Sequence, residues 1–414
     1  MAKRRVVVTG LGALTPVGKG APEFWNGLMS GKSGAKLIDN FDIEDFPTRF
    51  AAQIEDYDPS EYMSAKEARR MDKFCQYAMI TAEEAINNSE LDIGRIDPER
   101  VAVLIGSGIG GMQIFYKQAV EFHERGQKAI SPFFIPMLIP DMAAGQISIK
   151  YGFRGPNFCA VSACATGSHN IGLAYDTIVN DQADYAVCGG TEAPVFGMGL
   201  AGFIAARAMS TRNESPETAS RPFDKTRDGF VLGEGAGMMI LESYESAKER
   251  GARIYGELVG YGFSADAYHI TAPDPDGKGV VLAMNSALKS AGITPEDIEH
   301  INMHGTATPL GDVAETKSIK KVFGDHAYTM NLNSTKSMTG HMLGAAGAAE
   351  SIATVLAIYH GMIPPTINYE HPDPECDLNY TTNEAEPRDI TYGLNNAFGF
   401  GGHNTTLVFK KFDE

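Results

Sequence analysis

One cysteine in a run of small residues is the first candidate for chemistry. Cys164 stands in VSACATGSHNIGLAYDTI, residues 161–178, and the apolar residues from Ile171 to Ile178 have the spacing of one buried helix face. Cys164 is therefore predicted near a helix N-terminus, where unpaired N–H groups and the helix dipole lower the pKa of a thiol from its usual value of about 8.5. The alternative is a buried cysteine that packs as a small apolar side chain.

Two histidines stand in similar surroundings. His304 follows an apolar strand in NMHGTATPLGDVAE, and His341 opens a helix in STKSMTGHMLGAAG, where it follows Lys336. Small neighbours leave room for a substrate, so the pair is interpreted as part of a site rather than as structural residues. A metal centre would need a third close ligand at a regular spacing, and the sequence contains none.

Glycines dominate the last motif, NNAFGFGGHN at 395–404. They flank Phe398 and Phe400 and permit backbone conformations that approach a ligand closely. Such a turn can aim an N–H group at a developing oxyanion. A tight turn with a structural role only is the open alternative.

A second glycine-rich segment, GSGIGG at 106–111, formally matches the dinucleotide-binding pattern G-x-G-x-x-G. It lies between a predicted strand and a predicted helix. The second half of a dinucleotide-binding fold does not follow, because residues 131–146, SPFFIPMLIPDMAAGQ, are apolar and interrupted by proline. We interpret residues 131–146 as a loop that lines a pocket or an interface.

The elements that must position these residues alternate between strands and helices. Strands are predicted at 4–10, 100–108, 183–193, 235–243, 254–262, 298–306, 396–400 and 404–412. Helices are predicted between them, for example at 64–86 and 277–293. This alternation predicts an α/β protein whose sheets are covered by helices.

The two halves of the chain also contain similar segments. In the first half Cys164 precedes a helix rich in small residues, and in the second half residues 334–361, STKSMTGHMLGAAGAAESIATVLAIYHG, repeat a small-residue turn that leads into a Gly/Ala-rich helix. Two such helices can approach each other closely, which predicts a pseudo-symmetric molecule.

The composition excludes several classes of protein. Of the 414 residues 43% are hydrophobic and 21% are charged, which is typical of a soluble globular protein. No apolar run is long enough to span a membrane, and the start of the sequence, MAKRRVVVTGLG, is predicted to be a strand rather than a signal peptide. The five cysteines have no regular spacing and therefore predict neither a disulfide framework nor a zinc site. A reducing cytoplasm is the location that fits best.

The net charge of −17 argues against general affinity for nucleic acid or for anionic membranes. A local basic cluster stands out against this charge in residues 64–74, SAKEARRMDKF. On a continuous helix one face would carry its four basic residues, Lys66, Arg69, Arg70 and Lys73. The cluster is either a solvated helix face or a docking site for an acidic partner.

The motifs VSACATGSH, HGTATPLGD, KSMTGHMLGAAG and FGFGGHN occur together and in this order. With them the chain closely resembles, from Val6 to Phe409, the β-ketoacyl-acyl-carrier-protein synthases of fatty-acid elongation, and the type II enzymes of the dissociated bacterial system in particular. The resemblance implies a thiolase-like α/β fold with five αβαβα layers and two pseudo-symmetric halves. Residues 1–255 would carry the nucleophile and residues 256–414 the histidine pair. It also implies a cytoplasmic homodimer.

The reaction that the resemblance implies is a decarboxylative Claisen condensation. Cys164 would take an acyl chain from its carrier protein as a thioester. His304 and His341 would bind the malonyl thioester on its carrier protein and promote its decarboxylation, which yields the 3-oxoacyl carrier protein and carbon dioxide. Lys336 matches the lysine of the family's site, and Glu350 the acid that helps to organise it. No redox cofactor and no catalytic metal is implied, although a structural cation near Glu350 and residues 395–396 is compatible with the family.

The remaining roles follow from the same resemblance. Thr306 and Thr308 match threonines that contact pantetheine. Phe400 matches a gating phenylalanine whose N–H group, with that of the nucleophile, forms the oxyanion hole. Ile109 and Phe134 are similar to acyl-pocket residues. The implied docking site for acyl carrier protein consists of Lys66, Arg69, Arg70, Arg125, Lys128 and Arg207.

Some residues depart from the family pattern. Ser168 and His169 stand where threonine and asparagine are expected, so His169 is expected to alter the pocket wall. Cys376 does not match the second reactive cysteine of thiolases. A standalone polyketide-type ketosynthase is the alternative enzyme. A carrier-binding scaffold without chemistry is the alternative outside the enzymes, although such a partner would lack the cysteine.

Overall fold

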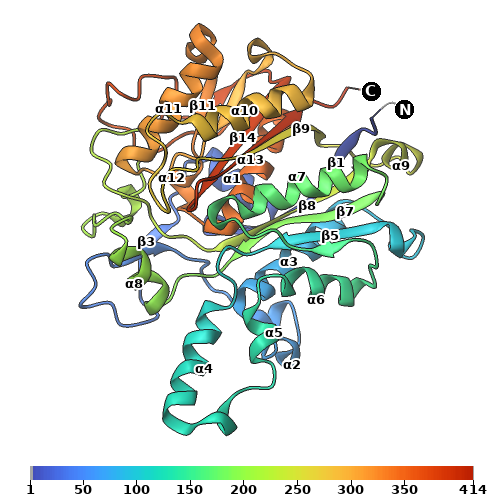
Figure 1. The fold of residues 1–414 in the computed structure, drawn as a ribbon, viewed down its shortest axis with the longest axis vertical. Coiled ribbons are helices and arrows are strands. Elements are labelled where there is room, and N and C mark those ends of the chain that lie inside the picture. The colour runs from blue at the N-terminus through green and yellow to red at the C-terminus, as the bar shows by residue number, and fades with distance from the viewer. Residues whose placement is uncertain (1–2, 414) are drawn as a thin grey trace.

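A mixed β-sheet runs through the protein, whose computed structural model describes residues 3–413 (Figure 1). Its eleven strands follow the order β11-β10-β14-β15-β9-β1-β8-β7-β5-β6, and β2 (Gly18–Lys19) pairs with β1. One set of strands comprises β1 (Val6–Thr15), β8 (Gly235–Ser243), β7 (Tyr185–Glu192), β5 (Val101–Gly106) and β6 (Asn157–Phe158). The other comprises β9 (Gly256–Ala265), β15 (His403–Lys410), β14 (Tyr392–Gly399), β10 (His300–Asn302) and β11 (Asn331–Asn333). All eight strands predicted from the sequence are confirmed.

The two sets have the same topology. From β1 outward the pairings are antiparallel with β8 and β7 and then parallel with β5 and β6. From β9 outward they are antiparallel with β15 and β14 and then parallel with β10 and β11. The sets meet where residues 6–8 of β1 pair with residues 256–258 of β9. The predicted internal duplication is therefore confirmed.

Helices form the other layers. The outer helices are α3 (Lys73–Asn88) and α6 (Met142–Tyr151) on the N-terminal set, and α10 (Lys278–Ala291) and α11 (Pro309–Phe323) on the C-terminal set. Between the two sets lie α7 (Thr166–Val179) and α13 (Ala346–His360), which contact strands of both (Figure 1). The protein therefore has the five-layered αβαβα arrangement of the thiolase-like fold.

Small residues let the two central helices touch. A Cβ atom placed on Gly167 of α7 would lie 2.9 Å from the backbone nitrogen of Ala348, and one on Gly347 of α13 would lie 2.2 Å from Ser168 Oγ. No larger residue fits at either position without a shift of its neighbours. This contact places the starts of both helices, and so both predicted site motifs, at the centre of the molecule.

The smaller elements surround this core. The remaining helices are α1 (Ala21–Met29), α2 (Ala65–Ala68), α4 (Met112–Arg125), α5 (Phe134–Leu138), α8 (Gly197–Ala205), α9 (Tyr244–Glu249) and α12 (Lys336–Thr339). Two small sheets pair β3 (Ala35–Leu37) with β4 (Phe50–Ala52) and β12 (Met362–Ile363) with β13 (Glu386–Pro387). Helices α4 and α5 project away from the layers (Figure 1). Within residues 3–413 every helix is too short or too polar to cross a membrane.

The helix predicted over 64–86 is not continuous, which corrects one expectation. Ser64 caps α2 with Glu67 in a capping box, and Asp72 caps α3 through the N–H of Phe74. The chain turns between the two helices, because each cap satisfies N–H groups that begin a new helix. Lys73 therefore belongs to α3 and does not share a face with Lys66.

Candidate active site

Cys164 lies in a short 3-10 turn, η4 (Ala163–Ala165), directly before α7. Ala163 has a φ of 51°, a left-handed conformation that costs energy for any residue with a Cβ atom. The Ser162 N–H donates to Thr166 Oγ1, which fixes the turn against the helix. The predicted position of Cys164 at a helix N-terminus is confirmed, and its side chain is only 8% exposed.

A cavity of about 430 Å³ opens in front of Cys164. Its walls include seven of the sixteen site residues that the sequence singled out, namely Cys164, His304, His341, Thr306, Thr308, Phe400 and Arg207. These residues come from both halves of the chain, so the fold brings together motifs that are far apart in the sequence. Other backbone strain surrounds the same cavity, where Arg207, Ala307 and Leu343 have φ angles of 54°, 66° and 47°.

The imidazole rings of His304 and His341 lie next to each other in the wall of the cavity. Their ring centroids are 5.4 Å apart, with the rings nearly perpendicular at 86°. Burial and the positive charge of Lys336 hold the pKa of both imidazoles well below the usual 6.5. Both rings are therefore neutral, and each can offer one N–H group to a developing negative charge.

The electrostatics of the thiol differ from the sequence prediction. Burial raises the pKa of Cys164 to about 12, although Lys336 and the N–H group of Phe400 act in the opposite direction. The expected lowering by the helix N-terminus is therefore outweighed by desolvation. At neutral pH Cys164 is therefore a thiol.

Lys336 and Glu350 form an ion pair behind the histidines, and both side chains are almost completely buried. Neither residue lines the cavity. The positive charge of Lys336 acts to lower the pKa of Cys164 and of both imidazoles. Glu350 Oε2 and Asn302 Oδ1 lie buried without a hydrogen-bond partner. These free oxygen atoms are of the type that a hard cation takes, so the residues fit the cation that the family allows.

The glycine-rich loop between β14 and β15 packs directly on the nucleophile turn. A Cβ atom on Gly399 would lie 2.6 Å from the Ser162 carbonyl oxygen and 3.1 Å from the backbone nitrogen of Cys164. The next N–H group, that of Phe400, lies close enough to the thiol to favour its ionised form. Gly401 and Gly402 have φ angles of 88° and 72°, so the turn requires glycine there. This geometry favours the oxyanion-hole interpretation over a purely structural turn.

A set of buried acids holds the histidine and threonine loop, and sequence reasoning missed it. Glu315 accepts the N–H groups of His304 and Gly305, each at 2.9 Å. Asp312 accepts the N–H group of Ala307 between the two threonines, at 3.2 Å. The available signal was the spacing of the two acids, i and i+3 at the start of α11, which places both on the face toward the loop.

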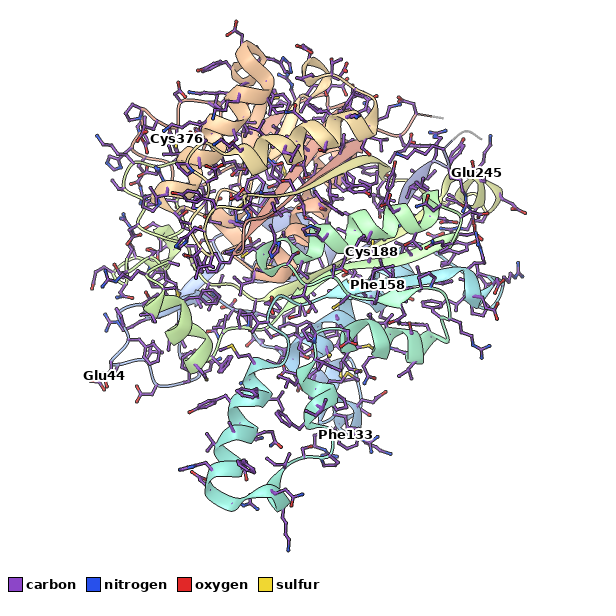
Figure 2. The ribbon with its side chains drawn as sticks, in the orientation of Figure 1. Glu44, Phe133, Phe158, Cys188, Glu245 and Cys376 are labelled. Atoms are coloured by element: carbon purple, nitrogen blue, oxygen red, sulfur yellow. The ribbon has the colours of Figure 1, made fainter. Side chains whose placement is uncertain are left out.

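The two predicted acyl-pocket residues lie in different places. Ile109 packs in the apolar cluster that contains Cys164 and Leu343, but within residues 3–413 it is not among the residues that line the cavity. Phe134 lies on the projecting α5, where it stacks against Phe115 at 6.3 Å, and it does not line the cavity. Figure 2 shows its neighbour Phe133 on that projection. Within one chain, Phe134 is therefore not part of the pocket at Cys164.

The six predicted docking residues are all exposed. Lys66, Arg69 and Arg70 lie on and just after α2, and the Arg70 guanidinium lies 4.7 Å from the ring centroid of Phe133. Arg125 pairs with Glu121 at the end of α4, and Lys128 follows it. Of the six, only Arg207 lines the cavity.

Three other features singled out in the sequence, namely His169, Cys376 and the GSGIGG segment, lie outside the cavity or are occupied by other contacts within residues 3–413. His169 does not line the cavity, which corrects the expectation that it alters the pocket wall; it bonds Ser162 Oγ and packs on Phe263. Cys376 lies away from the cavity, among the elements of the C-terminal half (Figure 2). The N–H groups of Gly108 and Ile109 in GSGIGG donate to the Glu192 carboxylate and are not available to a pyrophosphate.

A thiolase-like fold that joins a cysteine, two neutral imidazoles and inward N–H groups in one cavity defines an enzyme that condenses thioesters. Residues 3–247 match the family model of the "Beta-ketoacyl synthase, N-terminal domain", and residues 255–370 match that of the "Beta-ketoacyl synthase, C-terminal domain". The chain therefore belongs to the beta-ketoacyl synthase family.

Similar proteins agree with this assignment. The chain is 50% identical over 412 residues to a 3-oxoacyl-acyl-carrier-protein synthase 2 of Synechocystis sp., with 100% of this chain and 99% of the relative covered. It is 51% identical over 411 residues to the protein of that name in Coxiella burnetii, with 99% of each covered. Among solved structures, a ketosynthase bound to its type II polyketide synthase acyl-carrier protein superposes with a TM-score of 0.93 at 36% identity, with both chains fully covered. A beta-ketoacyl synthase from Burkholderia phymatum gives 0.92 at 33%, with 99% and 100% covered.

Proposed function

We propose that the protein elongates fatty acids by condensing a malonyl group with an acyl chain held on Cys164, and that acyl carrier protein delivers both. The observation that carries this proposal is the single cavity shared by Cys164, His304 and His341. The names of the relatives that are about 50% identical over the full chain support it. The product would be the 3-oxoacyl carrier protein, with release of carbon dioxide.

In the first half-reaction Cys164 Sγ forms a bond to the acyl carbonyl carbon, and the bond from that carbon to the pantetheine sulfur breaks. The carbonyl oxygen carries the negative charge between these events and accepts the N–H groups of Cys164 and Phe400. The proton of the Cys164 thiol passes to the leaving pantetheine thiolate, so this half-reaction neither takes up nor releases a proton. Thr306 and Thr308 hold the pantetheine arm in the cavity.

In the second half-reaction the malonyl carboxylate leaves as carbon dioxide and an enolate forms. Its oxygen accepts N–H groups from the neutral imidazoles of His304 and His341. The enolate carbon then attacks the acyl thioester, and Cys164 leaves as a thiolate that recovers a proton. Lys336, paired with Glu350, contributes positive charge to this site without touching the substrate.

The test separates the two half-reactions. Cys164→Ala should abolish acyl transfer to the protein but leave malonyl decarboxylation, whereas His304→Ala and His341→Ala should retain the acyl adduct and lose ~10²–10³ in decarboxylation rate. Intact-protein mass measures the adduct, and carbon dioxide release from malonyl carrier measures the other step. An acyl adduct on the Cys164→Ala protein would refute the assignment of the nucleophile.

We further propose that acyl carrier protein docks on the exposed cations Lys66, Arg69 and Arg70, with Arg125, Lys128 and Arg207 as additional contacts. Because the chain is acidic overall, attraction of an acidic carrier must come from a local patch. Reversal of Arg69 and Arg70 to glutamate should raise KM for carrier-bound substrates several-fold and leave short pantetheine thioesters unaffected. Equal losses with both kinds of substrate would contradict the docking site.

A homodimer is proposed from the surface of the N-terminal half. The edge strand β6 is exposed, and Phe158 within it is labelled in Figure 2. Phe158 is 42% exposed, and Val161, three residues further on, is 50% exposed. The projecting α4 and α5 expose Phe122 and Ile135, each to 57%. An open edge and an apolar surface of this kind need cover. A second copy of the chain would cover both surfaces. Sedimentation of the wild type and of Phe158→Lys tests this.

We also propose that the chain has two functional halves and that the protein is located in the cytoplasm. Division of the chain into functional halves at residue 255 follows from the duplicated strand sets. A cytoplasmic location is supported by its five free cysteines, because disulfides are rare in that compartment.

The second candidate is a standalone polyketide-type ketosynthase, favoured by the structural match to a ketosynthase bound to a hexaketide at 36% identity. Assays with saturated acyl carriers and with poly-β-keto carriers of graded length distinguish the two.

A further inference from the structure

One buried carboxylate near the site has no part in the mechanism above. Glu192 is the last residue of β7 and is 1% exposed. Its carboxylate accepts hydrogen bonds from Ser107 Oγ, from the N–H groups of Gly108 at 2.8 Å and Ile109 at 3.2 Å, and from the N–H group of Gly344 at 3.0 Å. These donors satisfy both oxygen atoms, so Glu192 has no further capacity to act as an acid or base on the substrate.

The donors belong to two turns that form the apolar side of the nucleophile. Ile109 and Leu343, the residue before Gly344, both pack in the cluster that contains Cys164. The turns touch directly, since a Cβ atom on Gly344 would lie 2.4 Å from the Gly108 nitrogen and 2.7 Å from Glu192 Oε2. Glu192 therefore joins two separate parts of the chain in the apolar cluster that contains Cys164.

The internal duplication explains why a carboxylate lies there. The turn η8 (Leu343–Ala345) precedes α13 as η4 precedes α7, and Leu343 repeats the left-handed conformation of Ala163 with φ angles of 47° and 51°. Gly344 is therefore the counterpart of Cys164. In the catalytic half the N–H of Cys164 is free to receive the substrate oxyanion, and in the other half the N–H of Gly344 donates to Glu192.

We propose that Glu192 is a positioning residue that fixes the turn of Ile109 against the turn of Leu343 and so sets which acyl chains Cys164 accepts. This inference rests on the proposed function, because it concerns the acyl chain on Cys164. The carboxyl group of Glu192 fills the duplicated turn from within the protein, because it accepts the N–H group of Gly344. Its loss would release the turns of Ile109 and Leu343 from each other without touching His304 or His341.

Glu192→Gln is the main test, because it keeps the size of the side chain but turns an NH₂ group toward N–H donors. We expect the ratio of kcat/KM for long-chain to short-chain acyl carriers to change by about tenfold, the effect of one hydrogen bond to a charged group. Decarboxylation of malonyl carrier should change less than about twofold, because that step uses the imidazoles. Ser107→Ala removes one donor and keeps Glu192, so it should change the ratio in the same direction by a smaller factor.

A matched control is Glu84→Gln. Glu84 also accepts two backbone N–H groups, from Ala13 and Ala21, but lies on α3 away from the cavity. It should lower Tm without a change in the chain-length ratio. An unchanged ratio in both Glu192→Gln and Ser107→Ala, with only Tm lowered, would overturn the proposal. A wild type that forms no acyl adduct would instead overturn the proposed function itself.

Discussion

The turn before α7 and the turn before α13 have the same backbone conformation but differ in what meets the N–H group of their central residue. At the end of β14 the residue next to the nucleophile turn is Gly399, whose missing side chain leaves the N–H of Cys164 uncovered. At the end of β7 the corresponding residue is Glu192, which bonds the N–H of Gly344. The strand pairings confirm this correspondence, because each residue pairs with the first residue of the following strand, His403 or Gly235.

The difference shows that one duplicated turn can serve chemistry or structure, depending on two side chains. A cysteine on the turn and a glycine beside it leave an anion site that a substrate can enter. A glycine on the turn and a glutamate beside it give a site that the protein fills itself. Anion binding is thus a property of the backbone, and the side chains decide which anion is bound.

The largest effect expected from this comparison concerns the Cys164 thiol. Its pKa is raised to about 12 by burial, so at neutral pH its thiolate fraction should be ~10³-fold below that of a free cysteine. Because a raised pKa keeps the proton on sulfur as pH rises, iodoacetamide alkylation of Cys164 should accelerate without a plateau through the usual range near 8.5. Peptide mass analysis against pH measures the rate.

The control is the same chain unfolded in denaturant, where alkylation should level off above a pH of about 8.5. A plateau below that pH in the folded protein would mean that the helix N-terminus dominates, as the sequence predicted.

The second prediction concerns the N–H group of Cys164, which a side chain at position 399 would crowd. Gly399→Ala places a Cβ atom 3.1 Å from the Cys164 nitrogen and 2.6 Å from the Ser162 oxygen, which is too close for backbone contacts. The oxyanion hole should be displaced, and acylation should slow by ~10²–10³ per folded molecule. Intact-protein mass with time measures the rate.

Gly393→Ala, on the same strand but against Thr354 and Ile358, is the control and should affect stability only. An acylation rate unchanged by Gly399→Ala would show that the Cys164 N–H does not stabilise the transition state.

The sequence predicted the elements of the fold because their apolar periodicity was regular, and it predicted the cysteine and histidine set because the family motifs are local. It failed where the outcome depended on contacts between distant segments. The break at Asp72 depends in part on such a contact, because Asp72 caps α3 and also accepts the N–H group of Ile114, which lies 42 residues away in the chain. The thiol pKa depends on burial by several segments, and Glu192 depends on turns that lie 84 and 152 residues away in the chain.

Phe134 illustrates the same limit at the surface. Its motif suggested an acyl-pocket residue, but α5 carries it out of the layers of its own chain. A pattern in one sequence contains no direct information on whether a residue serves its own subunit or a neighbour.

The smallest expected effect concerns the structural turn. Gly344→Ala adds a Cβ atom 2.4 Å from the Gly108 nitrogen, where only backbone and the Glu192 carboxylate can move aside. Overpacking of this kind costs about 1–3 kcal/mol in the free energy of unfolding, and denaturant titration measures it.

Gly202→Ala in α8, where a Cβ atom meets nothing within 4 Å, is the control and should be neutral or stabilising by up to about 1 kcal/mol. The catalytic turn carries a Cβ atom at the equivalent position, that of Cys164, so the two turns differ in the space that Glu192 occupies. If Gly344→Ala were as stable as Gly202→Ala, the carboxylate and the turn would not be tightly packed, and the contrast between a free and a filled anion site would no longer hold.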